Sequence, residues 1–238
     1  MRYSLDMALF GMLPGYTRVL LHCQNLNNRM SASTSLNLLR KAEQSVREEP
    51  KPVDENRSTQ IAVWQDAPSY FDTDLDRPKS LLETLVNRAR TGKTIPEADP
   101  LTNLMRAFAL QSRLPIGGDD LDQVSGNLWL RPARGNELFA PINQPELAQT
   151  PNIGEIIYVD DSPMVLCRHW NVWPGDHTKL TSDTQNAIVF LDTLPPLCSQ
   201  QAIDSGNRLA RLINGFLKSD VEIFALTSEN PVATLKVN

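Results

Sequence analysis

The pattern of apolar and polar positions changes along the chain, from helical spacing in the first half to short strand-like runs in the second. Apolar residues recur every three or four positions in three segments, residues 36–46, 81–89 and 101–108, which predicts helices with one buried face. From residue 127 onward the apolar runs are short and β-rich, and glycine, proline, aspartate and asparagine separate them. These runs, which predict strands, are NLWLRPA, EIIYVD, MVLCRHW and AIVFLDT.

Boundary signals support the helices. Ser80 followed by Glu83 is the pattern of a capping box, and that helix should end near Gly92. Asp99 and Pro100 are typical of an N-cap and a first helical residue. The serines at 33–35 are candidate caps for the first helix, which should end near EEPKP. That segment, through about residue 57, is the best candidate linker.

The order of elements favours an α+β fold. A β-prone run at 16–26 precedes the first helix, a late helix is predicted at about 200–217, and VEIFAL follows as a last strand. Strand and helices come first, followed by several strands, one helix and a strand, so the chain lacks regular βαβ alternation.

Composition narrows the function classes. The 238 residues are 41% apolar and 21% charged, enough for one large domain. With 28 acidic and 23 basic residues, the net charge of −5 argues against strong non-specific nucleic-acid binding, which needs basic residues to displace counterions. Three cysteines without C-x-x-C spacing favour free thiols in a reducing compartment, so we expect a cytoplasmic protein. Neither a signal peptide nor a run of membrane-spanning length is apparent, so we expect no membrane partner.

Carboxylates, guanidiniums and hydroxyls are concentrated between residues 115 and 184. Gly117 and Gly118 precede Asp119, Asp120 and Asp122, a pattern typical of a turn with a helix cap, or of hard oxygen ligands for a cation or an amine. The turn is the favoured interpretation, because the spacing does not match a calcium-binding loop.

Two further groups have both a structural and a functional interpretation. Arg131 and Arg134 can grip a carboxylate or phosphate, or Glu137 can satisfy them internally. Thr178 and Thr181 are expected to cap turns, or to turn their hydroxyls to a cleft.

A zinc site formed by Cys167, His169, Asp176 and His177 is disfavoured, because paired ligand spacing is missing. A cysteine-protease role for Cys167 is disfavoured too, because nothing around it activates a nucleophile. We expect no metal and no cofactor.

Residues from about 61 to 217 resemble the B3/B4 domain of the phenylalanyl-tRNA synthetase beta subunit, and above all its freestanding relatives. The resemblance rests on LPIGGDDLD, VSGNLWLRPARGNE and GEIIYVDD, and then on CRHW, GDHTKLTSDT and AIVFLDTL. The amino-terminal GYTRVLLHCQNLNN also resembles the freestanding group. We therefore expect a single B3/B4-like domain over 1–238, with a strand–helix extension at 1–56 and a core at 57–238.

The resemblance implies an α+β layered fold, with a β-sandwich of unusual topology and flanking helices. It also implies editing, the hydrolysis of the ester that joins a wrong amino acid to tRNA. Asp119, Asp120 or Asp176 would steer the attacking water, and an arginine such as Arg168 would stabilise the oxyanion. The substrate would be bound by the residues Gly117, Gly118, Asp122, Arg131, Arg134, Glu137, Thr178 and Thr181.

Two departures from the family pattern stand out. Gly117 occupies the position of a histidine in the synthetase, and His169 stands where the freestanding group has a second arginine. The chain has no aminoacylation domain, so it should not charge tRNA by itself. The expected function is hydrolysis of misacylated tRNA in trans; the alternatives are a non-catalytic module that binds an amino acid, a nucleotide or an RNA end, and an interaction domain without a ligand.

Overall fold

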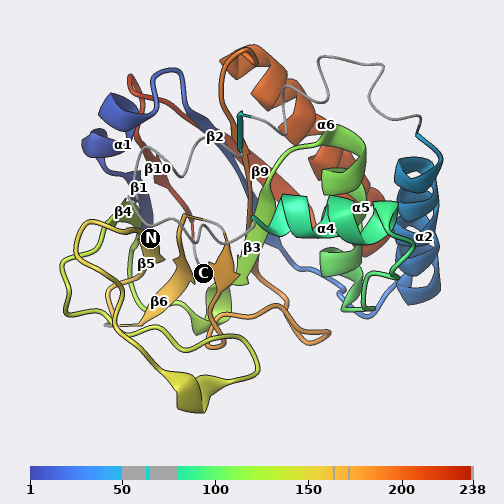
Figure 1. Ribbon diagram of the computed structural model, residues 1–238, viewed down its shortest axis with the longest axis horizontal. Coiled ribbons are helices and arrows are strands. Elements are labelled where there is room, and N and C mark those ends of the chain that lie inside the picture. Colours follow the sequence, from blue (N-terminus) through green and yellow to red (C-terminus); the bar gives the residue numbers. More distant parts are fainter. Residues whose placement is uncertain (50–62, 65–79, 163, 171, 237–238) are drawn as a thin grey trace.

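The computed structural model describes residues 1–49, 63–64, 80–162, 164–170 and 172–236, whose strands form two sheets. The first sheet has the order β10 (Val232–Thr234), β1 (Arg2–Leu5), β4 (Leu128–Pro132), β5 (Ile156–Val159), β6 (Val165–Arg168) and β7 (Trp173–Pro174). The second has the order β3 (Ile116–Asp120), β8 (Ala187–Thr193), β2 (Thr17–Gln24) and β9 (Asp220–Leu226). Figure 1 shows their arrangement.

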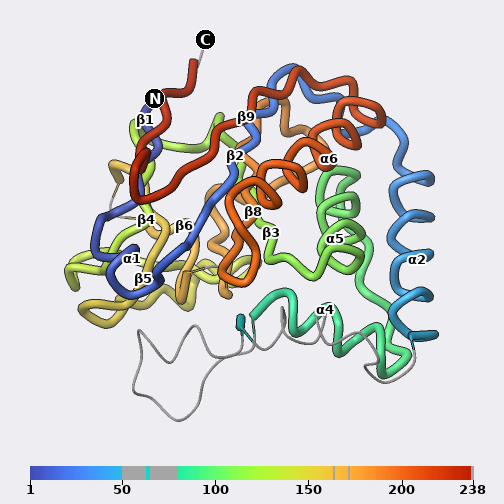
Figure 2. Tube along the Cα trace, turned by 90° about the horizontal axis from the view of Figure 1, so that it is seen from above, coloured from blue at the N-terminus to red at the C-terminus, as the bar shows by residue number. Residues whose placement is uncertain are grey.

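The two sheets differ in pairing. The four-stranded sheet is antiparallel throughout, and every residue of its inner strand β8 is buried. In the six-stranded sheet β1 runs parallel to β4, whereas the other pairs are antiparallel. Since β1 also pairs with β10, the two chain ends lie side by side (Figure 2).

Helices pack on the four-stranded sheet and on one another. Within the described residues the α-helices are α1 (Met7–Met12), α2 (Ala32–Glu48), α4 (Leu81–Arg90), α5 (Pro100–Ser112) and α6 (Ser199–Leu217). Helix α1 instead contacts β4 of the six-stranded sheet. Helix α6 packs against β2 and β9, and α5 packs against α2 and α6. Gly206 permits close packing of α6, because a Cβ there would lie 2.6 Å from Val19 Cγ1. Figures 1 and 2 place α2 at the end of the molecule opposite the six-stranded sheet.

The α+β class predicted from the sequence is confirmed, and so are most element boundaries. Ser80 and Glu83 form the predicted capping box, and the Asp99 side chain caps α5. The first helix differs from the prediction, because its N-cap is Ser31 and the serines at 33–35 lie inside it. The predicted linker at 48–57 lies outside the described residues, except for Glu48 and Glu49 at its start.

The GGDD segment at 117–120 differs more from its prediction, because residues 116–120 form strand β3 where the sequence predicted only a turn with a helix cap. The cap itself is present, since Asp120 is the N-cap of a short 3-10 helix at Leu121–Gln123. Glycine disfavours strands, but the pairing of β3 with β8 outweighs that local preference. Strands β1 and β10 and helix α1 were not predicted either.

The first 49 residues are built into both sheets. Strand β1 lies between β10 and β4, and β2 lies between β8 and β9. The division into an extension at 1–56 and a core at 57–238 stays a prediction, but β2 supplies Val19, Leu20 and Leu21 to the main apolar core. No helix within the described ranges is long and apolar enough to span a membrane.

Candidate functional site

A buried ion pair joins the two strands at the centre of the four-stranded sheet. Arg18 on β2 and Asp192 on β8 are paired in register, and both side chains are fully buried. The guanidinium donates from Nε and Nη2 to the two carboxylate oxygens at 2.6 and 2.7 Å. Its Nη1 donates to the Tyr3 hydroxyl of the other sheet at 2.6 Å, and its carbon lies 4.2 Å from the centre of the Phe190 ring.

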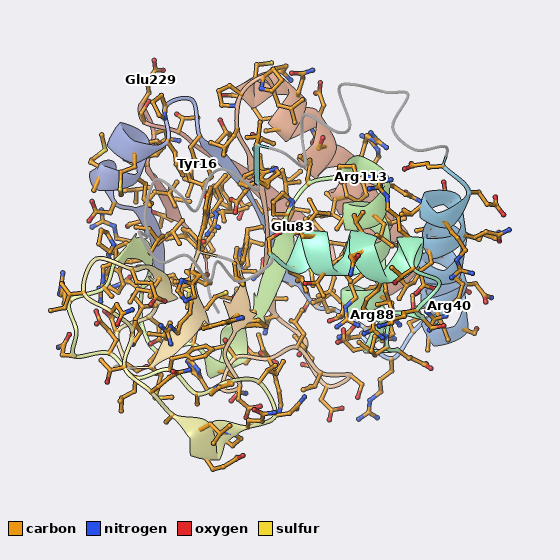
Figure 3. The ribbon with its side chains drawn as sticks, viewed as in Figure 1. Tyr16, Arg40, Glu83, Arg88, Arg113 and Glu229 are labelled. Carbon is orange, nitrogen blue, oxygen red and sulfur yellow. The ribbon has the colours of Figure 1, made fainter. Side chains whose placement is uncertain are left out.

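The ion pair continues into a chain of hydrogen bonds. The Tyr16 hydroxyl donates to Asp192 at 2.7 Å and accepts from the Trp170 indole nitrogen at 3.2 Å. Tyr16 is labelled in Figure 3, well apart from Arg40 and Arg88 on the helices. Moving the sheets apart would leave a buried charge without its partner, which costs free energy. This polar chain therefore ties the two sheets together. Sequence reasoning missed it, although one arginine in TRVLLHC and one aspartate in AIVFLDT were available signals.

Asp119 on β3 is a carboxylic acid near this chain of hydrogen bonds, and its pKa is raised. It is only 7% exposed, and its Oδ1 accepts a hydrogen bond from the Thr178 hydroxyl at 2.6 Å. Burial raises the pKa of Asp119 to about 7, although the Thr178 bond and the Arg18 charge oppose the rise. The negative charges of Asp160 and Asp120 contribute to it. Asp119 therefore exchanges a proton near neutral pH.

Asp120, the next residue, holds the turn after β3. Its carboxylate accepts from the Asp122 backbone N–H at 3.0 Å and from the Thr184 hydroxyl at 2.6 Å. Thr184 in turn accepts from the Thr181 backbone N–H. Asp122 is exposed and accepts from Asn186. These bonds give Asp120, Asp122, Thr181 and Thr184 local structural roles.

The position of the family histidine has no free space around it. A Cβ at Gly117 would lie 2.4 Å from Phe190 Cζ, because the phenylalanine ring lies over the glycine in the paired strand. Gly118 follows in the same strand. Any side chain at position 117 would therefore meet the apolar Phe190 ring from β8.

A pocket of about 470 Å³ lies on the six-stranded sheet and the loops that follow its strands. We call it the outer pocket; it is lined by Trp129, Arg131, Arg134, Asn136, Glu137, Asp160, Asp161 and Ser162. It contains three residues predicted for substrate binding, Arg131, Arg134 and Glu137.

Glu137 organises one wall of the outer pocket. Its carboxylate accepts from Arg131 Nη1 at 2.6 Å and from the backbone N–H groups of Arg134, Gly135 and Asn136 at 2.9 to 3.2 Å. Burial works against these donors, but together they lower the pKa of Glu137. Arg131 is thus paired internally, as the structural interpretation of the sequence expected. Arg134 is exposed, and its guanidinium makes no hydrogen bond or ion pair with the described residues.

The last two residues predicted to be catalytic are bonded elsewhere. Asp176 accepts from Lys179 Nζ at 2.8 Å and from the Asn143 backbone N–H at 2.7 Å. Arg168 makes a bidentate pair with Glu155 at 2.8 and 2.6 Å, and both side chains are about 5% exposed. The described residues therefore divide the predicted set into four groups. These are Asp119 with Thr178 near the inter-sheet chain, the turn held by Asp120, the outer pocket, and the two structural pairs of Asp176 and Arg168.

The zinc alternative gains no support. Burial raises the pKa of the Cys167 thiol well above its usual range, which opposes the thiolate that zinc needs. Over the part of the chain that the structure describes, no three histidine, cysteine or acidic side chains are grouped as metal ligands.

These features define the class of the protein. It is an α+β protein of two sheets, with a chain of hydrogen bonds between the sheets and a turn at residues 134–137, the RGNE turn, which Glu137 holds on the outer side. Residues 66–211, more than half of the chain, match the family model described as the B3/4 domain. The chain belongs to the B3/4 domain family.

Comparison with solved structures gives 16 matching chains. One is an N-terminal fragment of the phenylalanyl-tRNA synthetase beta-subunit from Pyrococcus horikoshii, with 12% sequence identity and a TM-score of 0.46. The match covers 92% of this chain and 49% of the other, so this chain spans about half the length of that fragment. Among curated protein sequences nothing matches.

Proposed function

We propose that this chain acts on the aminoacyl end of tRNA and hydrolyses the ester of a misacylated tRNA in trans. Membership of the B3/4 domain family and the resemblance of its motifs to the editing domain support a tRNA-related role. The observation that carries the proposal is Asp119, a carboxylic acid beside a hydroxyl with a pKa of about 7. An acid–base group is most effective when its pKa lies near the working pH.

The proposed reaction uses Asp119 as a general base. The carboxylate removes a proton from water while the water oxygen attacks the ester carbonyl carbon. The bond between that carbon and the tRNA ribose oxygen then breaks, and the ribose oxygen takes the proton from Asp119. Free amino acid and uncharged tRNA are the products. The Thr178 hydroxyl orients the carboxylate, whereas Asp120, Asp176 and Arg168 keep the structural roles described above.

Glycine at 117 bears on the substrate. The resemblance places a histidine of the synthetase at this position, where the Phe190 ring leaves no room for a side chain. Position 117 therefore offers the substrate no polar side chain. We infer that the amino acid recognised differs from that of the synthetase.

The test is a deacylation assay with the purified chain and a panel of correctly and incorrectly charged tRNAs. Wild type should accelerate ester loss for at least one misacylated tRNA, and Asp119→Asn should abolish the acceleration. Asp183→Asn is a matched control, because Asp183 is an exposed carboxylate paired with Arg29. Rates equal to spontaneous ester loss for every tRNA would overturn the proposal.

A non-catalytic binding module is the second candidate, and the outer pocket favours it. The pocket holds the exposed Arg134 guanidinium, which has no ion-pair partner among the described residues, and the Trp129 ring as an aromatic wall. Saturable binding of charged tRNA without accelerated ester loss, in the same preparation, would select this candidate.

A further inference from the structure

Strand β9 differs from the other strands at the edges of the two sheets. Within the described residues three of the four edge strands have features that limit further pairing. Strand β10 has three residues, and β7 has two, one of which is Pro174. Strand β3 contains two glycines, and its Asp120 backbone N–H donates to the Thr178 carbonyl at 2.9 Å. Strand β9 has seven residues and lies at the side of its sheet away from β3 (Figure 2).

The backbone of β9 has few partners besides β2. All seven residues pair with β2 in one continuous antiparallel register. In such a strand, alternate residues direct their N–H and C=O groups away from the neighbouring strand. In the part of the chain that the structure describes, one further hydrogen bond reaches the backbone of residues 221–226, from the Asn230 side chain to the Ala225 carbonyl at 3.5 Å. Strand β9 therefore has backbone groups free to pair with another strand.

The side chains of β9 do little to protect this edge. The strand, DVEIFAL, contains no proline, glycine or lysine. Of its two charged residues, Asp220 begins the strand, and the Glu222 carboxylate lies 3.9 Å from the His22 ring of β2. The residues at 221 and 223–225 are apolar and only partly buried. A long, apolar and unprotected edge of this kind favours pairing with a further strand.

The flank of α6 beside β9 adds little charge. Asn214 donates from its side chain to the Ser219 carbonyl at 2.8 Å, immediately before β9, and Asn207 lies two turns earlier on the same face. Arg208 and Arg211 lie on another face of the helix, where they line a groove with α5. A nucleic acid would find little counter-charge beside β9, whereas a second copy of the same nearly neutral surface would not be repelled.

We propose that β9 pairs with β9 of a second copy of this chain, antiparallel about a two-fold axis, so that the two four-stranded sheets become one continuous sheet. An axis at Ile223 pairs all seven residues of the strand. Asp220 then lies opposite Leu226 of the second copy, and Glu222 lies opposite Phe224, so no two carboxylates are directly opposed. An axis at Glu222 would oppose two carboxylates and is disfavoured. The interface requires no tRNA and no ester, so it is independent of the proposed hydrolysis.

Sedimentation velocity of the full chain over a range of concentrations tests the proposal. Wild type should sediment as a dimer of two 26.6 kDa chains at high concentration and dissociate on dilution. Ile223→Lys should weaken dimerisation by at least about tenfold, because it opposes two like charges at the axis and because lysine blocks pairing at strand edges. The urea midpoint checks that the fold is kept, since the lysine stem can lie along the apolar surface.

Ile153→Lys is the matched control. Ile153 is 81% exposed on the loop before β5 of the other sheet, and the same change there should leave the dimer intact. Loss of the dimer in Ile153→Lys but not in Ile223→Lys would place the interface at that loop and overturn the proposal.

Disulfide cross-linking gives a second test that does not depend on the lysine variant. In a Cys198→Ser background the two remaining cysteines are buried. Ile223→Cys should then form a disulfide between two copies under mild oxidation, because residue 223 lies opposite itself. Glu229→Cys, in the turn after β9, should not, because the two turns lie at opposite ends of the paired strands (Glu229 is labelled in Figure 3). Equal cross-linking of the two variants, or a wild type that stays monomeric at every concentration, would overturn the proposal.

Discussion

The inter-sheet group and the outer pocket contain the same kinds of side chain in opposite states. Between the sheets, Arg18 and Asp192 are fully buried and bonded on every side. On the outer side, Arg134 is exposed and unpaired among the described residues, and Asp160 and Asp161 accept hydrogen bonds from backbone N–H groups of neighbouring loops. The inter-sheet charges hold the two sheets together, and the outer ones line a pocket.

The difference shows how burial determines what a charged group can do. A guanidinium without contact to water must be paired in the fold, so it is not available for a ligand. Asp119 lies between these extremes, because it is buried but bonded mainly to a hydroxyl. Burial raises the pKa of Asp119 to about 7, and the hydrogen bond from Thr178 offsets only part of the rise. Substitutions in the two regions should therefore differ in the size and kind of their effect.

The largest effect is expected from Asp192→Asn. The change leaves the Arg18 guanidinium buried without a counter-charge, which should lower the free energy of unfolding by about 3–5 kcal/mol. Urea unfolding followed by circular dichroism measures it. Asp183→Asn breaks an exposed ion pair and should cost less than about 1 kcal/mol. Equal losses in the two variants would show that the buried pair has no special role.

A smaller loss is expected from Gly117→Ala. The new methyl group would overlap the Phe190 ring, so the free energy of unfolding should fall by about 1–3 kcal/mol. Phe190→Leu shortens that side chain, and the double variant should lose less than the two single variants added together. Additive losses would mean that the ring does not exclude a side chain at 117.

Asp119→Asn should change how stability depends on pH. The folded pKa of about 7 lies above the ordinary value of 3.8, so the stability from this group is complete below about pH 4 and is lost as the pH rises through about 7. Between about pH 5 and about pH 8, wild type should lose more stability than Asp119→Asn. Urea midpoints at the two pH values measure this, and parallel losses would place the pKa of Asp119 outside that range.

The smallest effect on stability is expected in the outer pocket. Arg134→Gln removes an exposed guanidinium without a partner among the described residues, and should change the free energy of unfolding by no more than about 0.5 kcal/mol. Thermal melting of this variant beside wild type checks the value. A larger loss would show that Arg134 supports the fold and would weaken its assignment to a ligand.

Local patterns were enough to predict α2, α4, α5 and α6, because caps such as Ser80 with Glu83 act over one turn, but they did not predict α1. They were not enough for β3, since two glycines and two aspartates form a strand here only through pairing with β8. The candidate stretch at residues 115–184 was found from composition. Its division could not be predicted, because Arg18 and Asp192 are 174 positions apart in sequence and meet only in the sheet.

The most direct test of the proposed function is the rate of ester loss from misacylated tRNA as a function of pH, after subtraction of spontaneous hydrolysis. With wild type, the enzyme-dependent rate should rise as Asp119 loses its proton and level off above about pH 7. With Asp119→Asn, the enzyme-dependent rate should be lost at every pH. A substituted chain that keeps the wild-type rate and profile would contradict Asp119 as the general base.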